Sequence, residues 1–167
     1  MTHKDCGSSR CGIDTVDIAR IERLLAQTPA ADLRKLFSAQ ELADSGDGPG
    51  RAARLAARFA AKEACAKLFP RELALGQIEL ADFSVAHDDY GAPHAVLSEV
   101  AQAVLVRKRL RGIALSLSHD RTSASAVALA EADAGALIRF WRWCTRTFRR
   151  RSALAHARPR RTASDDR

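Results

Sequence analysis

The alanine-rich segment from Arg51 to Phe69 constrains the fold of this chain more than any other part of its sequence. Alanine has the highest helix propensity and Pro70 cannot continue a helix, so we predict one long helix over residues 51–69. At about 100° per residue, Glu63 and Lys67 share one face of this helix with three alanines, Ala52, Ala56 and Ala60. The other cations lie on a different side of the helix: Arg51, Arg54, Arg58 and Lys62. We expect the basic side to face solvent and the alanine face to admit another backbone at close range.

The rest of the chain up to residue 130 mixes strand and helix patterns. Strands are predicted over residues 10–16, 82–87, 94–97, 112–118 and 125–130, the last two as buried strands around a turn at residues 119–122. Helices are predicted over residues 17–26 and 98–109, and the capping-box spacing of Ser38 and Glu41 indicates a further short helix. This mixture predicts an α+β fold.

The net charge of +7 over 167 residues comes from the end of the chain. Residues 139–167 contain ten arginines and two aspartates, a net +8, which leaves −1 for residues 1–138. An interaction driven by charge therefore concerns this end only. Four of the nine aromatic residues also lie there, so we predict a basic amphipathic helix followed by a disordered end. Packing on the body or on a neighbouring subunit is the expected role, with a membrane-surface or nucleic-acid arm as the alternative.

The sequence also argues against a membrane or secreted protein and against a zinc-binding or disulfide-rich one. No stretch approaches the ~20 apolar residues that cross a bilayer, and residues 1–10 lack the apolar run of a signal peptide, so we expect a soluble, cytoplasmic protein. The cysteines at positions 6, 11, 65 and 144 lack the paired spacing of a zinc site and the density of a disulfide scaffold. We expect free thiols, with a Cys6–Cys11 bridge as the alternative.

Four titratable residues allow both a structural and a functional interpretation. Asp14 stands between a strand and a helix, where a helix N-cap is as common as a catalytic acid. Glu63 and Lys67 have the i,i+4 spacing of an ordinary solvent-exposed ion pair. His119 follows a strand, and no base partner lies beside it in sequence, so a turn residue is favoured over a serine hydrolase triad.

Taken in order, five short motifs resemble the 4′-phosphopantetheinyl transferase superfamily, in particular its short holo-[acyl-carrier-protein] synthase type. They are GID at 12–14, RFAAKEA at 58–64, DFSV at 82–85, GAP at 91–93 and LSLSH at 115–119. The resemblance covers about residues 10–131 and implies an antiparallel sheet packed against the long helix. It divides the chain into an N-terminal extension at 1–9, a transferase domain at 10–132 and the basic, aromatic-rich tail at 133–167.

The resemblance implies an enzyme that transfers 4′-phosphopantetheine from coenzyme A to a serine of an apo acyl or peptidyl carrier protein and releases adenosine 3′,5′-bisphosphate. Such carriers serve fatty-acid, polyketide or peptide synthesis. It also implies a homotrimer with active sites between subunits and no nucleic-acid partner. The alternative, drawn from the charged tail, is a non-catalytic basic module that binds nucleic acid or an anionic membrane.

The resemblance further implies roles for single residues. Asp14 and Glu63 would hold Mg²⁺, with Mn²⁺ as the alternative, because both ions accept carboxylate oxygens. Glu63, or a metal-bound water, would take the proton of the serine, and Lys67 would neutralise charge that builds up on the phosphates or the leaving group. The expected contacts to coenzyme A are Arg58, Lys62, Gly91, Pro93, Ser116, Ser118 and His119, and the expected carrier-docking residues are Arg20 and Arg23.

The chain departs from the family pattern at three places. The glycine-rich segment that usually follows the catalytic helix is missing, since residues 68–72 read LFPRE and only Gly76 follows. Ala92 stands where the family often has lysine, and the basic tail is an addition. These departures leave a third interpretation open, a degenerate member that binds coenzyme A without turnover.

Overall fold

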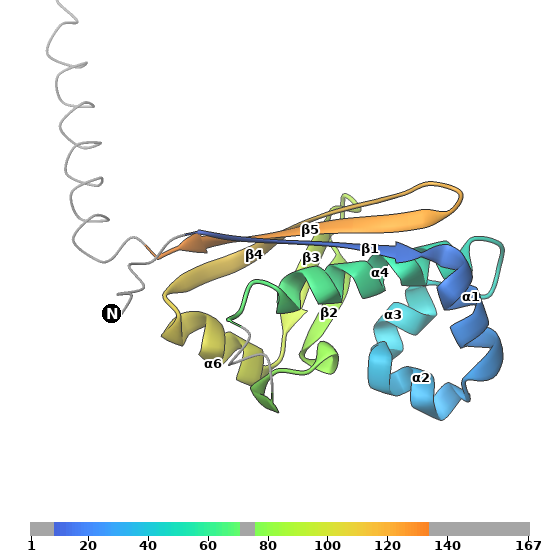
Figure 1. Ribbon diagram of the computed structural model, residues 1–167, viewed down its shortest axis with the longest axis horizontal. Helices are drawn as coiled ribbons and strands as arrows, with labels where there is room; N and C mark the ends of the chain where they lie inside the picture. Colours follow the sequence, from blue (N-terminus) through green and yellow to red (C-terminus); the bar gives the residue numbers. More distant parts are fainter. Residues whose placement is uncertain (1–8, 71–75, 134–167) are drawn as a thin grey trace, which may run out of the picture. The chain divides into compact units, whose positions relative to one another are not determined.

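The computed structural model of the protein describes residues 9–70 and 76–133 (Figure 1). Their strands form a five-stranded sheet of order β1-β5-β4-β3-β2, and every neighbouring pair is antiparallel. The strands are β1 (Arg10–Asp17), β2 (Phe83–His87), β3 (Pro93–Leu97), β4 (Leu110–His119) and β5 (Ser123–Ala132). The predicted α+β class with an antiparallel sheet is confirmed.

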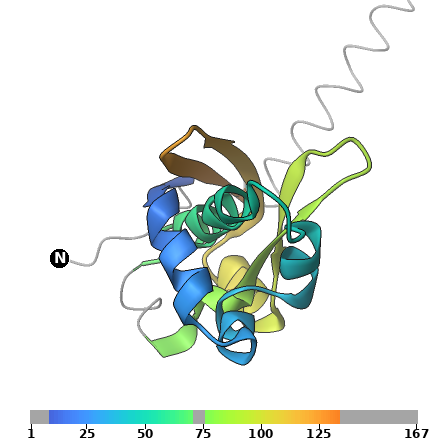
Figure 2. The ribbon, with the colours of Figure 1, turned by 90° about the vertical axis from the view of Figure 1, so that its right-hand side faces the viewer.

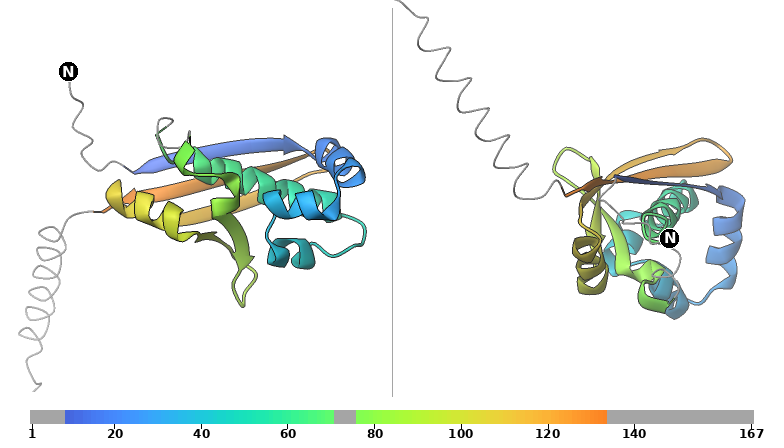
Figure 3. Two further views of the ribbon diagram at one scale, coloured as in Figure 1. Left: turned by 90° about the horizontal axis from the view of Figure 1, so that it is seen from below. Right: turned by 60° about the vertical axis from the view of Figure 1, so that its left-hand side comes forward.

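The helices lie on one side of the layer formed by β1, β5 and β4, which leaves the opposite face of these strands without a helix among the described residues (Figures 1 and 3). They are α1 (Ile18–Gln27), α2 (Ala30–Leu36), α3 (Ala39–Asp44), α4 (Arg51–Ala66), the 3₁₀ turn η1 (Leu80–Asp82) and α6 (Glu99–Arg107). Figure 2 looks almost along α4, with the β4–β5 hairpin on one side of it and α1 beside it. Among the described elements, the alanine-rich helix thus has a central position.

Small side chains bring α4 and the sheet together. The inward-facing residues of β5 are Ala124, Ala126, Ala128 and Ala130, each at most 1% exposed, and α4 presents Ala56, Ala60 and Ala64 to the same core. Alanines on both layers allow a closer approach than larger side chains would, as the sequence of α4 predicts. Leu55, Leu68 and Phe83 supply larger buried side chains around this contact, each worth about 1.5–3 kcal/mol of transfer free energy.

The structure differs from the predicted elements at several points. Helix α4 ends at Ala66, with Lys67 as its C-cap, before the predicted end at Phe69. Helix α2 was not predicted, because its seven residues are short and its N-cap Pro29 offers no side-chain hydrogen bond. β5 is buried on one face only, and the inward-facing residues of β4 beyond Leu110 are only partly buried, so the prediction of two buried strands is wrong.

Some predictions fall on residues that the structure does not describe. The chain divides after Asp133, and the predicted basic helix beyond it stays a prediction. Cys6, one half of the alternative Cys6–Cys11 bridge, also lies outside the described residues. Of the cysteines that are described, Cys11 is an exposed free thiol and Cys65 is a buried one. Among the described residues, no helix is long and apolar enough to span a membrane.

Candidate active site

Strand β1 crosses helix α4 at Gly12. A Cβ atom at this position would overlap the carbonyl oxygen of Ala64 and lie 3.2 Å from the Cβ atom of Lys67. Further along the chain, the guanidinium carbon of Arg20 lies 5.8 Å from the centroid of the Phe59 ring. The chain from β1 into α1 therefore runs in the opposite direction to α4. Residues that follow Gly12 in β1 lie toward the earlier turns of α4.

Asp14 follows this crossing and points to the α4 side of the sheet. Its carboxylate is 19% exposed, and Lys67 Nζ donates to Asp14 Oδ1 at 2.8 Å and to the Ile13 carbonyl oxygen at 2.8 Å. Asp14 is not a helix cap, because Asp17 caps α1 by accepting the Ala19 N–H at 2.7 Å. The structure thus joins two of the predicted catalytic residues directly.

Glu63 lies one helical turn before Lys67 and is partly buried. Within residues 9–70 and 76–133, its carboxylate takes part in no hydrogen bond or ion pair. The interpretation of Glu63 and Lys67 as an ordinary surface ion pair is therefore wrong, since Lys67 binds Asp14 instead. A partly buried carboxylate with free acceptor sites is suited to bind a cation or to accept a proton.

The donor set around this crossing fits a hard divalent cation. Asp14 and Glu63 offer carboxylate oxygens, and only one oxygen of Asp14 is engaged, by Lys67. In the described part of the chain no group of three or more His, Cys, Asp or Glu side chains is placed to hold a metal. The two carboxylates suit Mg²⁺, which commonly takes one or two carboxylates and fills its other positions with substrate phosphates and water.

Arg58 is a buried cation that is only partly paired. Its Nη1 donates to the Arg54 carbonyl oxygen at 3.2 Å, its Nη2 lies 3.9 Å from Asp44 Oδ2, and its Nε has no partner among the described residues. Burial lowers the pKa of the guanidinium, and the charge of Asp44 opposes that shift. The prediction that Arg58 faces solvent is wrong, but its unsatisfied N–H leaves it able to bind an anion.

The position of Lys62 contradicts the prediction that its side chain faces solvent. Its ammonium is enclosed in the core, 2.8 Å from Glu41 Oε2, and it donates to the Leu36 carbonyl oxygen at 2.7 Å. Burial lowers the pKa of Lys62, while the Glu41 carboxylate acts in the opposite direction. Lys62 is therefore not placed to contact a phosphate of coenzyme A. The partner Glu41 was found from sequence only as a capping-box residue, because nothing local indicates an ion pair across 21 positions.

The residues of the LSLSH motif divide between the two faces of the sheet. Ser116 and Ser118 pair with Val127 and Ser125 of β5 and point to the face without helices. His119 pairs with Ala124, whose side chain is buried on the α4 side, so His119 lies on the same side of the sheet as Asp14. The structure does not bring the two serines together with the Asp14–Lys67 pair within one chain.

Gly91 and Pro93 lie in the β2–β3 hairpin, at the other edge of the sheet from Asp14. Gly91 has φ of +80°, which favours glycine, and its N–H donates to the Asp88 carbonyl oxygen at 2.9 Å. The sheet order places β5 and β4 between β1 and β3, so the two sites are about 14 Å apart across the strands alone. These two residues also lie away from the Asp14–Lys67 pair.

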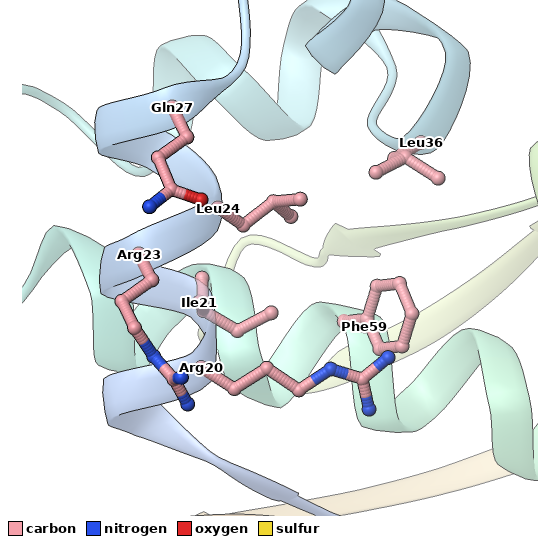
Figure 4. Close-up of a pocket in the computed structure, with 7 residues that line it drawn as sticks. All are labelled: Arg20, Ile21, Arg23, Leu24, Gln27, Leu36 and Phe59. Carbon is pink, nitrogen blue, oxygen red and sulfur yellow. The ribbon is translucent and has the colours of Figure 1, made fainter.

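Arg20 and Arg23 line an open pocket of about 590 Å³ between α1, the end of α2 and α4, which we name the α1 pocket (Figure 4). Its other lining residues are Ile21, Leu24, Gln27, Leu36 and Phe59. The four apolar side chains make it a hydrophobic hollow with two arginines beside it. The two arginines were predicted from the sequence but the apolar lining was not, because Leu36 and Phe59 come from other elements.

Residues 10–130 match the model of the 4′-phosphopantetheinyl transferase superfamily. The chain belongs to this superfamily. Among curated relatives, the holo-[acyl-carrier-protein] synthase of Alkalilimnicola ehrlichii is 44% identical over 125 residues, which cover 72% of this chain and 94% of that protein. The synthase of Syntrophus aciditrophicus is 37% identical over 120 residues, which cover 72% and 93%.

Solved structures of phosphopantetheinyl transferases of this type share the fold. The holo-[acyl-carrier-protein] synthase from Neisseria meningitidis has a TM-score of 0.62 and 27% identity, covering 73% of this chain and 97% of that one. The Helicobacter pylori synthase in complex with coenzyme A has a TM-score of 0.60 and 26% identity, covering 72% and 99%. The predicted family, fold and enzyme class, a transferase of the holo-[acyl-carrier-protein] synthase type, are confirmed.

Proposed function

We propose that this transferase moves 4′-phosphopantetheine from coenzyme A to a serine of an apo acyl carrier protein at a site built on Asp14, Glu63 and Lys67. Family membership carries the reaction, and the close crossing of β1 over α4 is the observation that supports the site. In the reaction, the serine oxygen forms a bond to the phosphorus that bears the pantetheine. The bond from that phosphorus to the bridging oxygen breaks, and adenosine 3′,5′-bisphosphate leaves with that oxygen.

Each of the three residues has a role that its surroundings support. Glu63, whose carboxylate is unpaired in the described part of the chain, accepts the serine proton. Lys67, half-exposed and within hydrogen-bond reach of Asp14, neutralises charge on the leaving phosphate. Asp14 and Glu63 would together hold Mg²⁺, or Mn²⁺ as the alternative. When bound, such an ion neutralises the diphosphate of coenzyme A.

We place the docking of the carrier protein at the α1 pocket. Its apolar lining would accept an apolar side chain, and Arg20 and Arg23 would attract an acidic helix of the carrier. Arg20 is held over the Phe59 ring, with 5.8 Å between its guanidinium carbon and the centroid, so it is partly ordered before docking. Docking of this kind speeds association and weakens with salt.

The active assembly is a homotrimer with sites between subunits. Ser116 and Ser118, on the face without helices, and Gly91 and Pro93, in the far hairpin, would contact the coenzyme A held at the Asp14 site of a neighbouring chain. Arg58 and His119 would contact the phosphates of coenzyme A. Exposed apolar side chains on the face without helices, Ile13 and Leu129, support burial of that face against another copy.

The test is transfer to an apo acyl carrier protein incubated with coenzyme A and Mg²⁺ and followed by mass spectrometry. The full chain should add the phosphopantetheine group, and Glu63→Ala should abolish the addition while its circular dichroism and unfolding midpoint stay unchanged. Glu99→Ala, which removes an exposed glutamate at the start of α6, is the matched control and should transfer normally.

Two outcomes would contradict the proposal. No mass gain with the unaltered chain would exclude the transferase activity, and an unimpaired gain with Glu63→Ala would remove that residue from its role. A chain truncated after Ala134 should also retain transfer. If transfer were absent from every form while salt-dependent binding to nucleic acid or anionic vesicles required residues 135–167, the rival function of a basic binding module would be favoured.

A further inference from the structure

The enclosed ion pair of Lys62 and Glu41 has no part in the chemistry described above. Lys62 Nζ and Glu41 Oε2 are 2.8 Å apart, and their side chains are 1% and 0% exposed. The same ammonium donates to the Leu36 carbonyl oxygen at 2.7 Å and lies 5.6 Å from the centroid of the Phe37 ring. Lys62 of α4 therefore holds two consecutive residues at the junction of α2 and α3.

Glu41 extends these contacts to a third element. Its Oε2 accepts the Ser38 N–H at 2.8 Å, which completes the capping box of α3, and its Oε1 accepts the Val85 N–H of β2 at 2.9 Å. Both carboxylate oxygens thus have backbone donors. One buried pair connects α4, the α2–α3 junction and β2, and a buried charge is tolerated only when it is paired in this way.

The junction held by this pair is one wall of the α1 pocket. Leu36 lines the pocket, and the Phe37 ring packs against Phe59, another lining residue, with 6.3 Å between ring centroids. Figure 4 shows Leu36 and Phe59 facing Leu24 and Ile21 of α1 across the hollow. Helix α2 has only seven residues and no side-chain N-cap, so its position depends on tertiary contacts.

We propose that Lys62 and Glu41 are positioning residues that set the width of the α1 pocket by fixing Leu36 relative to α1. The inference rests on the proposed docking of the carrier protein in that pocket. It assigns to Lys62 a role in carrier recognition in place of the predicted contact with a phosphate of coenzyme A. Neither residue touches the carrier, since both are enclosed.

The test compares Lys62→Met and the double variant Lys62→Met with Glu41→Gln. The double variant removes both charges at nearly constant volume, so it keeps a folded form available if the single variant unfolds. We expect the KM for the carrier protein to rise about five- to tenfold, while kcat and the KM for coenzyme A stay within about twofold. Arg111→Met, which breaks a surface pair with Asp133, is the control and should change none of these values.

Two further measurements decide the inference without relying on transfer. The Ser38 and Val85 amide protons should exchange faster in the double variant, and calorimetry without coenzyme A should show weaker binding of the apo carrier. A raised KM for coenzyme A with an unchanged carrier KM would restore the phosphate role and overturn the inference. Unchanged carrier binding despite faster exchange would also overturn it, because the carrier would then dock elsewhere. Absence of transfer by the unaltered chain would instead contradict the proposed function.

Discussion

Gly12 of β1 lies so close to Ala64 of α4 that no side chain fits between them, since a Cβ atom at position 12 would overlap the Ala64 carbonyl oxygen. This close contact places the α4-facing side chains of β1 next to the helix. It allows Lys67 Nζ to come within 2.8 Å of Asp14 Oδ1 across 53 positions of sequence. The geometry of the candidate site thus depends on a packing contact between Gly12 and Ala64, neither of which takes part in the proposed chemistry.

Replacement of Gly12 by alanine should therefore destabilise the protein and impair transfer. Forcing a methyl group into a filled contact costs about 1–3 kcal/mol, and the shift of β1 would separate Asp14 from Lys67. Urea denaturation measures the first effect and the mass-spectrometric transfer assay the second. Gly48→Ala is the control, because a Cβ there meets nothing within 4 Å, and its free energy of unfolding should change by less than about 0.5 kcal/mol. Equal stability of the two variants would contradict the packing argument.

Lys67→Ala should lower the rate of transfer by about 10²–10³-fold, the loss expected when one group that stabilises developing charge is removed. The fold should be kept, since Lys67 is half-exposed and its pair with Asp14 contributes less than about 1 kcal/mol. Single-turnover kinetics with saturating coenzyme A and carrier measures the rate. A rate equal to that of the unaltered protein would remove Lys67 from catalysis.

Lys62→Met should lower the free energy of unfolding by about 3–5 kcal/mol, because it leaves the Glu41 carboxylate buried without its cation. Lys35→Met is the matched control. Lys35 also forms an ion pair, 2.6 Å from Asp32 Oδ1, but both side chains are exposed, so the change should stay below about 1 kcal/mol. Chemical denaturation at neutral pH measures the free energy of unfolding of both variants. Similar losses for both lysines would mean that burial does not decide the strength of these pairs.

Leu129→Asp should convert the proposed homotrimer into monomers and reduce transfer at least about tenfold, because a charge would be introduced on the face that we propose joins the subunits. Leu129 is 49% exposed in the single chain, so the change does not disturb the core. Light scattering coupled to gel filtration measures the mass. Val106→Asp, at a 64% exposed position of α6, should leave the mass unchanged. A fully active monomer of the unaltered chain would contradict the trimer.

The turn between β4 and β5 should contribute stability that depends on pH. Backbone N–H groups of Ser123 and Thr122 donate to Asp120 Oδ1, each at 2.7 Å, and lower the pKa of Asp120 from 3.8 to about 2. The folded state thus favours the ionised carboxylate. This contribution is present above about pH 4 and is lost as the pH falls through about 2.

Asp120→Asn, which keeps an acceptor oxygen but no charge, should be less stable than the unaltered chain near neutral pH. Urea denaturation at several pH values should show this difference shrinking between about pH 4 and pH 2. A difference that does not vary with pH would show that the turn does not depend on the charge of Asp120.

Local elements were predictable because their signals act over a few residues. Ser38 caps α3 at the predicted spacing, and β2 and β3 form the predicted hairpin, since capping and turn formation depend on neighbouring residues. Helix α2 escaped prediction because its short sequence carries no cap, and contacts with Lys62 and Phe59 hold its C-terminal end.

Sequence patterns predicted the central helix, the class of the fold and, through the order of the motifs, the family. They did not predict which way each charged residue of α4 faces or which partner it takes, because both depend on tertiary packing. Lys62 meets Glu41 in the core and Lys67 meets Asp14 at the sheet, although both were candidates for the same phosphates. The physical reason is that a helical period gives the relative directions of side chains, whereas their surroundings depend on how the helix is rotated against a sheet assembled from distant strands.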